Sequence, residues 1–315
     1  MWQREAAVLS RIAEALFWIG RYVERADDTA RLLQTHLRVM IESSPTSESE
    51  SCGNLLALMG IDGIENPGKD DLLRVLGYDA RESSSIFASW AAARDNARRA
   101  REVIPAELWQ CINTTWHNLP SGRIQLTQAH GFCDWARERS ALFSGLARGT
   151  MVRDDGWQYL LLGRSLEQAD MTSRMVASAA PATGTTQWPQ VLRGAGGHDA
   201  FLRTYRGVHS DTGAAEFLIV DARFPRSVMH GLVAASDCLD TVSQAKPGHT
   251  AVAKAQRMLG RLRAHLEYAP IDDIVANLNA EMVRVQDVCA DVSEIAAKAF
   301  FAAADARAWI REGTR

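Results

Sequence analysis

The stretch VLSRIAEALFWIGRYVERADDTARLLQTHLRVMIE, residues 8–42, decides the fold class. Apolar side chains recur along it at alternating gaps of four and three residues, which is the stripe of a helix packed along one side. These side chains are Ile12, Leu16, Ile19, Val23, Ala26, Ala30, Leu33 and Leu37. At 1.5 Å per residue, such a helix would be about 50 Å long. Only a bundle or an elongated architecture accommodates that length, so we expect an all-α fold, an elongated helical bundle.

Helical patterns continue through the rest of the chain, with a second long helix expected at residues 157–178. Shorter helices are predicted at 53–60, 70–77, 83–103, 105–118, 123–147, 212–222, 225–241, 247–268 and 272–311. Residues 43–51, with Pro45, are predicted to form a loop, and the proline- and glycine-containing residues 179–199 a surface connection. The only strand-like run, residues 218–220, lies among helical neighbours.

The two long helices carry an internal repeat. Seven residues of the first recur in the second at a fixed offset of 143 positions. The matching pairs are Gly20 and Gly163, Arg21 and Arg164, Glu24 and Glu167, Ala26 and Ala169, Asp27 and Asp170, Thr29 and Thr172, and Arg31 and Arg174. Most of these residues are polar, so a shared apolar pattern cannot explain the match. We interpret it as duplication of a helical unit, which predicts two pseudo-symmetric halves, residues 1–150 and 151–315, packed as one unit.

Helical geometry gives the repeat a physical meaning. Gly20, Glu24, Asp27 and Arg31 share one face, about 70° from the apolar stripe, so we expect them at the edge of the core and partly buried. Glycine inside a helix costs roughly 1 kcal/mol relative to alanine. Its recurrence in both copies therefore predicts a close approach of another backbone at each glycine.

Ion pairs are expected within each copy of the repeat. Asp27 and Arg31 have the four-residue spacing of a helical ion pair, and Asp170 and Arg174 have the same spacing. Glu24 and Arg21 form a further candidate pair at a spacing of three. A partly buried network of this kind fixes how two helices cross, because each charge must find a partner.

Composition excludes several classes of protein. Hydrophobic residues make up 47% of the 315, enough for a substantial core, and the net charge of -3 argues against a nucleic-acid partner or an anionic membrane surface. The five cysteines are odd in number and form no CxxC pair, as suits a reducing compartment. Neither a signal-sequence core nor an uninterrupted apolar stretch of about 18 residues is present, so we expect a cytoplasmic protein.

The repeat carries a resemblance to a known family. Residues 9–11 and 17–27 resemble the N-terminal signature of the alpha-E domain family, bacterial α-helical proteins with a Glu-Arg motif. Residues 151, 156–157 and 162–170 resemble its second signature, and residues 93–98 and 224–228 resemble further family elements. The resemblance spans essentially the whole chain. One departure is Gln168, where the Glu-Arg pair would place an arginine.

The resemblance implies partners rather than an activity. Members of the family are associated with circularly permuted ATP-grasp ligases, which join a carboxylate to an amine, and often with transglutaminase-like proteins. The candidate binding residues are the motif positions of both copies together with the arginine of the family element at residues 224–228. They are Gly20, Arg21, Glu24, Arg25, Asp27, Arg31, Gly163, Arg164, Glu167, Asp170, Arg174 and Arg226.

Four carboxylates on two long helices also suggest a metal site, formed by Glu24, Asp27, Glu167 and Asp170. Di-iron bundles use Glu-x-x-His on such helices, and no glutamate here has a histidine three residues later. Arginines accompany each carboxylate and can neutralise it. We therefore expect structural ion pairs, with no metal and no cofactor.

Two functional hypotheses follow. No HExxH, phosphate-binding glycine loop or nucleophile motif is present in the sequence, which favours a helical accessory or scaffold protein, without independent activity, that binds an ATP-grasp ligase in an amide- or peptide-forming system. The alternative is an enzyme acting on an amide or peptide at a polar site between the two repeat helices. A deep polar cleft lined by Arg21, Glu24, Arg164 and Glu167 would favour the enzyme.

Overall fold

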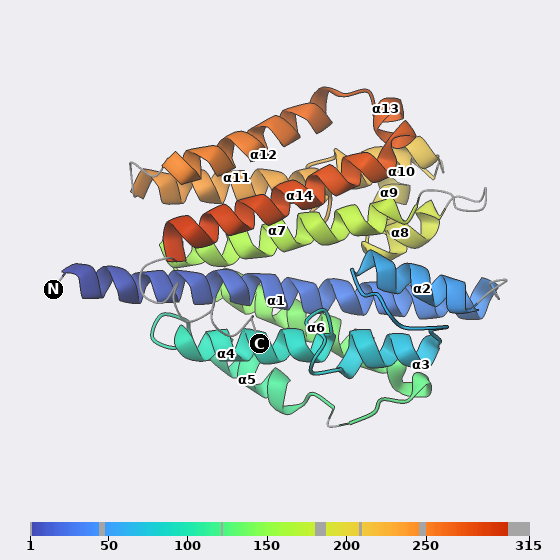
Figure 1. The fold of residues 1–315 in the computed structure, drawn as a ribbon, viewed down its shortest axis with the longest axis horizontal. Helices are drawn as coiled ribbons and strands as arrows, with labels where there is room; N and C mark the ends of the chain where they lie inside the picture. Colours follow the sequence, from blue (N-terminus) through green and yellow to red (C-terminus); the bar gives the residue numbers. More distant parts are fainter. Residues whose placement is uncertain are drawn as a thin grey trace.

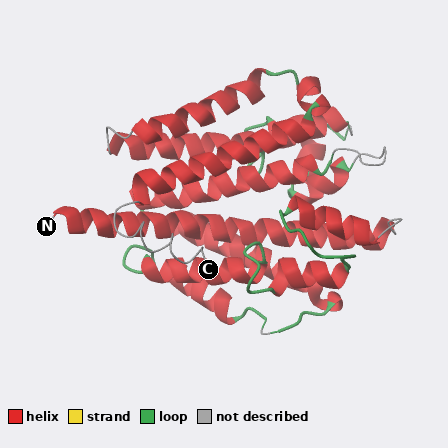
Figure 2. Cartoon of the chain, in the orientation of Figure 1, coloured by secondary structure: helices red, strands yellow, loops and turns green. Residues whose placement is uncertain are grey.

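The computed structural model describes residues 2–43, 48–120, 122–179, 187–207, 210–245 and 250–301. Over these ranges the chain is all-α and contains no strand (Figure 2). The α-helices are α1 (Trp2–Ser43), α2 (Glu48–Leu58), α3 (Lys69–Leu72), α4 (Ile86–Arg99), α5 (Ala106–His117), α6 (Ala129–Thr150), α7 (Asp155–Ala177), α8 (Trp188–Gly194), α9 (His198–Thr204), α10 (Asp211–Ile219), α11 (Val228–Ala245), α12 (Thr250–Tyr268), α13 (Ile271–Ala276) and α14 (Leu278–Ala296). Short π-helical segments η1 (Leu73–Tyr78) and η3 (Ala297–Phe301) and the 3₁₀ segment η2 (Leu126–Gln128) complete the described elements. None of the described helices has the length and apolar content needed to cross a lipid bilayer.

Helix α1 is the central element of an elongated bundle (Figure 1). Its 42 residues span about 60 Å. It packs against α4 and α6 on one side and against α7 on the other. The apolar stripe predicted from the sequence lies in the core, with every member buried except Ile12, which is partly buried.

Two groups of helices flank the contact between α1 and α7. In the first, α1 packs against α4 and α6, and α5 packs against both of these helices. In the second, α7 packs against α11 and α14, and α12 packs against both. Each long helix thus has two neighbours that a third helix joins.

Because α4 and α6 cover one side of α1 and α7 covers the other, the middle of α1 is more buried than a single apolar stripe predicts. Residues 26–30 are all buried, including Asp27, Asp28 and Thr29. Placing the polar repeat face at a partly exposed edge of the core was therefore wrong for Glu24 and Asp27, which are only 3% and 6% exposed.

Residues 179–199 differ most from the expected fold. The prediction of a surface connection was wrong for residues 188–194, which form α8 and bury Trp188, Val191 and Leu192. A proline in the first turn is compatible with a helix, so Pro189 lies in the first turn of α8 without preventing it. The segment predicted as one helix over 272–311 is divided into α13, α14 and η3, and its last ten residues lie outside the described ranges. The predicted loop at 43–51 is shorter than expected because α2 begins at residue 48.

Candidate functional site

The two repeat glycines lie where α1 and α7 cross. A Cβ atom added to Gly20 would lie 2.1 Å from the carbonyl oxygen of Leu160, and one added to Gly163 would lie 2.0 Å from that of Phe17. Each glycine thus faces the residue three positions before the other glycine. The predicted close approach of a second backbone is confirmed at both positions.

Ion pairs cross between the helices on either side of this contact. Arg21 Nε donates to Glu167 Oε2 at 2.5 Å, and Arg164 Nε donates to Glu24 Oε2 at 2.7 Å. Each contact joins the positions that correspond to the other contact at the offset of 143 residues. The predicted pair between Arg21 and Glu24 of the same helix was wrong, because the close crossing brings the opposite helix's carboxylate within reach of each arginine.

The two four-residue ion pairs are confirmed. Arg31 Nε lies 2.9 Å from Asp27 Oδ2, and Arg174 Nε lies 2.9 Å from Asp170 Oδ2. Arg174 also donates to the backbone carbonyl of Leu58 at 3.1 Å.

Glu167 is held by two arginines of α1. Besides Arg21, Arg25 donates to Glu167 through Nε at 2.5 Å and through Nη2 at 3.1 Å. Burial alone would raise the pKa of Glu167, which is 1% exposed, but the charges and hydrogen bonds of Arg21 and Arg25 outweigh it and lower the pKa to about 2. Glu167 is therefore a structural anion, and neither of its oxygens lacks a hydrogen-bond donor.

Glu24 differs from Glu167 because the helix that it faces, α7, has only one arginine of the motif, Arg164, where α1 has two. Gln168 occupies the position that corresponds to Arg25, and its amide donates to the backbone carbonyl of Pro225 at 2.5 Å. Thr172 donates to the next carbonyl, that of Arg226, at 3.1 Å. Both bonds hold the loop before α11 against α7, and the guanidinium of Arg226 then lies 3.1 Å from Glu24. Arg226 therefore supplies the charge that an arginine at 168 would have supplied.

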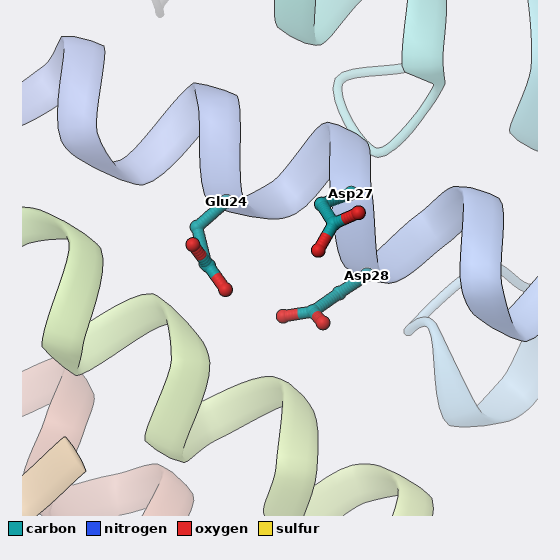
Figure 3. A group of neighbouring side chains, drawn as sticks. All are labelled: Glu24, Asp27 and Asp28. Atoms are coloured by element: carbon teal, nitrogen blue, oxygen red, sulfur yellow. The ribbon is translucent and has the colours of Figure 1, made fainter. Parts of the chain in front are cut away.

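Arg226 also binds two further carboxylates of α1. Its Nη1 lies 2.9 Å from Asp27 Oδ2, and its Nη2 contacts Asp28 Oδ1. Figure 3 shows Glu24, Asp27 and Asp28 turned toward one another from two successive turns of α1. Asp28 was not among the residues singled out from the sequence. The adjacent acidic pair Asp27-Asp28 in the middle of the long amphipathic helix was the signal that could have found it.

The three carboxylates are not equivalent. Burial raises the pKa of Asp28, which is fully buried, and the nearby charges of Glu24 and Asp27 add to this effect; against the opposing charge of Arg226, the result is a pKa of about 8. Burial also acts to raise the pKa of Asp27, but Arg226 and Arg31 lower it below its ordinary value. Asp28 thus holds a proton near neutral pH, while Asp27 is ionised.

Oxygen atoms of Glu24, Asp27 and Asp28 lie within 4.8 Å of one another, a spacing that a metal ion could bridge. This grouping differs from the metal site considered from the sequence, because Glu167 and Asp170 are not part of it. The guanidinium of Arg226 reaches all three carboxylates. It supplies the positive charge that a metal would otherwise contribute.

A pocket of about 320 Å³ opens beside this cluster. Its charged lining residues are Glu24, Asp27, Arg31, Arg148, Arg164 and Arg226, and residues 140, 141, 144 and 145 of α6 form one wall. The polar cleft considered from the sequence is therefore present at Glu24 and Arg164. Arg21 and Glu167 are not among its lining residues, and Arg21 instead donates to Ser293 of α14 at 2.8 Å.

The cysteines do not supply a nucleophile to this pocket. All five are buried and unpaired. Burial raises the pKa of Cys133 and of Cys238 to about 12 and that of Cys52 to about 11. A thiol with such a pKa is almost entirely protonated at neutral pH and is a poor nucleophile.

Comparison with known proteins identifies relatives along nearly the whole chain. Residues 8–301 match the family Alpha-E, described as a predicted alpha-helical domain with a conserved ER motif. An uncharacterized protein of Mycobacterium bovis is 24% identical over 90% of this chain, and one of Mycobacterium tuberculosis strain H37Rv is 23% identical over the same share. The chain spans only 36% of the length of these relatives. No solved structure matches it.

Proposed function

Since the chain belongs to the Alpha-E family, we propose that it is a helical accessory or scaffold protein that partners a circularly permuted ATP-grasp carboxylate–amine ligase. The system it serves forms an amide or peptide bond, and a transglutaminase-like protein is a further partner. The observation that carries the accessory role is the pairing of the motif glutamates, Glu24 and Glu167, with arginines of the opposite helix. Ion pairs between two buried helix faces hold the helices at a fixed crossing, which is a structural role.

Two other findings support this role. The cysteines are buried, and burial raises their pKa values, so they are poor candidates for thiol catalysis. The mycobacterial relatives are nearly three times as long as the segment they share with this chain. A helical domain joined to much more sequence in one polypeptide suits a protein that acts together with other domains.

The matched contacts at the crossing also support duplication of a helical unit, with halves at residues 1–150 and 151–315. The glycine contacts and the ion pairs of α1 and α7 correspond under exchange of the two copies. Superposing α1 and its neighbours on α7 and its neighbours in an experimental structure tests this proposal. Flanking helices that fail to occupy equivalent positions would contradict it.

The enzyme alternative has one observation in its favour. The pocket reaches Glu24 and Arg164 at the helix crossing, and it is lined by charged groups. A site there would act on an amide or peptide between the repeat helices. In that case Glu24 would serve a reaction rather than the fold.

Replacing Glu24 by glutamine distinguishes the two roles. If Glu24 is structural, Glu24→Gln leaves Arg164 and Arg226 short of a charged partner and lowers the free energy of unfolding by about 1–3 kcal/mol. Binding to the ligase should then weaken only as far as folding does. Glu267→Gln, at an exposed position of α12, is the matched control.

The measurements are urea denaturation, co-purification with the untagged ATP-grasp ligase of the same organism, and product formation by the reconstituted pair. All three use the same protein samples. A Glu24→Gln protein that is fully stable and binds the ligase, yet yields no product, would overturn the accessory role in favour of the enzyme.

A further inference from the structure

The pocket beside Arg226 carries an excess of positive charge. Four of its six charged lining residues are arginines, and two are carboxylates. Arginine stays protonated at any physiological pH, so Glu24 and Asp27 neutralise at most two of the four guanidinium charges. The carboxyl of Asp28, behind Arg226, holds a proton near neutral pH because its burial raises its pKa to about 8. The pocket therefore has about two positive charges that its own carboxylates do not neutralise.

Several hydrogen-bond donors in this pocket have no acceptor among the residues that the structure describes. Arg164 bonds to Glu24 through Nε, and its terminal nitrogens make no hydrogen bond within the described ranges. The exposed guanidinium of Arg148 has neither a hydrogen bond nor an ion pair with any described residue. Nε of Arg226 has no acceptor among the described residues, but it is buried away from the pocket, as are Oε1 of Glu24 and Oδ1 of Asp27, which lack donors. The donors that a ligand can reach are therefore those of Arg148 and Arg164, and a ligand that supplies oxygen atoms would accept their hydrogen bonds.

The positions of these donors indicate the shape of that ligand. Arg148 comes from α6, Arg164 from α7 and Arg226 from the loop before α11, while Arg31 adds a fourth guanidinium from α1. A carboxylate has two oxygens in one plane and a single charge, so it would leave one positive charge uncompensated. A phosphoryl group has three or more acceptor oxygens in different directions and nearly two negative charges at pH 7.

We propose that the pocket between α1, α6 and α7 binds a phosphoryl group, either as free phosphate or as a phosphate monoester. Asp27 and Glu24 hold Arg31, Arg164 and Arg226 in place before the ligand arrives, so little side-chain ordering remains to be done on binding. Arg148 lies at the exposed side and completes the set of donors. This inference goes beyond the proposed partnership, because the chain alone should bind the ligand.

Two glycines of α6 give a matched pair of variants. Gly145 lines the pocket, and a Cβ atom there would meet nothing within 4 Å. Gly145→Glu therefore adds a negative charge at the pocket without a steric clash with the surrounding backbone. Gly131 is also exposed, with nothing within 4 Å of its Cβ position, but it is not a lining residue. Gly131→Glu introduces the same side chain into the same helix about 20 Å away.

A second pair of variants removes one positive charge. Arg148→Gln deletes the unpaired guanidinium of the pocket. Arg261→Gln deletes an exposed arginine of α12, a helix that contributes nothing to the pocket lining. Neither side chain has a hydrogen bond or ion pair with a described residue, so both variants should fold like the wild type.

Isothermal titration calorimetry at pH 7.5 and constant ionic strength tests the proposal with inorganic phosphate, glycerol 3-phosphate and, as a carboxylate of equal charge, succinate. We expect one phosphate or phosphate ester per chain. Arg148→Gln should weaken binding about tenfold or more, the effect of losing one charge-assisted hydrogen bond. Gly145→Glu should weaken it by about as much because the added carboxylate repels the phosphoryl group, while Gly131→Glu and Arg261→Gln leave binding unchanged.

The arms of the experiment separate the sources of the ligand. Tighter binding of glycerol 3-phosphate than of phosphate would assign the pocket to a phosphate monoester, and equal or tighter binding of phosphate would assign it to the free ion. Absence of binding to both, tighter binding of succinate, or equal losses in the pocket and control variants would overturn the proposal. None of these outcomes depends on the ligase, so failure here leaves the proposed partnership standing.

Discussion

Replacing Gly163 by alanine should destabilise the fold although alanine is the better helix former. The added Cβ atom would lie 2.0 Å from the carbonyl oxygen of Phe17, whereas real Cβ atoms essentially never approach closer than 3.0 Å. The two helices must therefore move apart by about 1 Å at their crossing. Because both contacting atoms are fixed to helical backbone, no side-chain rotation can relieve the collision.

The cost of this movement has two parts and one compensation. Overpacking in a close-packed core costs typically 1–3 kcal/mol. Moving α1 from α7 also lengthens the hydrogen bonds from Arg21 to Glu167 and from Arg164 to Glu24, each worth about 1.5–3 kcal/mol when intact. Against these losses, alanine is about 1 kcal/mol more favourable than glycine inside a helix. With part of each ion pair retained, we expect Gly163→Ala to lower the free energy of unfolding by about 3 kcal/mol.

Urea denaturation followed by circular dichroism measures this loss. Gly260→Ala is the control, because a Cβ atom at Gly260 of α12 meets nothing within 4 Å. That variant should be unchanged or more stable by up to about 1 kcal/mol. Gly20→Ala should resemble Gly163→Ala, and the double variant should cost less than their sum because one separation of the helices serves both. A Gly163→Ala midpoint equal to that of Gly260→Ala would refute the close approach.

Three further predictions concern titratable groups. The pKa of Glu167 falls from its ordinary value near 4.5 to about 2 in the fold. Its ionised form therefore contributes about 3 kcal/mol to the free energy of unfolding above pH 4.5, and this contribution is lost as the pH falls toward 2. Glu167→Gln should remove this part of the acid dependence in urea denaturation at pH 2–6. The opposite sign applies to Asp28, whose pKa rises to about 8. The stability that its protonated form contributes is complete below pH 4 and is lost as the pH rises through 8. In urea denaturation, Asp28→Asn should be at least as stable as the wild type at pH 8, and its free energy of unfolding should fall less between pH 5 and 9. The buried thiols, including Cys133 and Cys238, should react with Ellman's reagent only when the protein unfolds, and rapid labelling of the native protein would contradict their burial.

The sequence predicted those features that depend on local spacing. The apolar stripe of α1 identified a long packed helix, because its period is a property of consecutive residues. Gly20 and Gly163 predicted a close backbone contact, because glycine in mid-helix needs a compensating reason. The pairs of Asp27 with Arg31 and of Asp170 with Arg174 followed from their spacing of four residues.

Features that depend on which helices become neighbours could not be predicted in this way. Arg21 pairs with Glu167 rather than with Glu24 because α7 crosses α1 at the glycines, and helix spacing alone does not show which of the two carboxylates is nearer. Asp28 is buried because helices cover α1 on more than one side. The group of carboxylates around Arg226 joins residues 198 and 199 positions apart, a separation over which no periodic pattern carries information.

That separation has a consequence for the order in which the chain can fold during its synthesis. Helix α1 leaves the ribosome before the other described helices, and α4 and α6 follow within the next 107 residues of chain after its end at Ser43. Arg226 is made only 198 residues after Asp28, a delay of roughly 10–40 s at ordinary rates of translation. During that interval Glu24, Asp27 and Asp28 have no Arg226 to neutralise them, so water must solvate this face of the nascent helix. The cluster around Arg226 can therefore be completed only after residue 226 has been made, when α1, α4, α6 and α7 have already been synthesised.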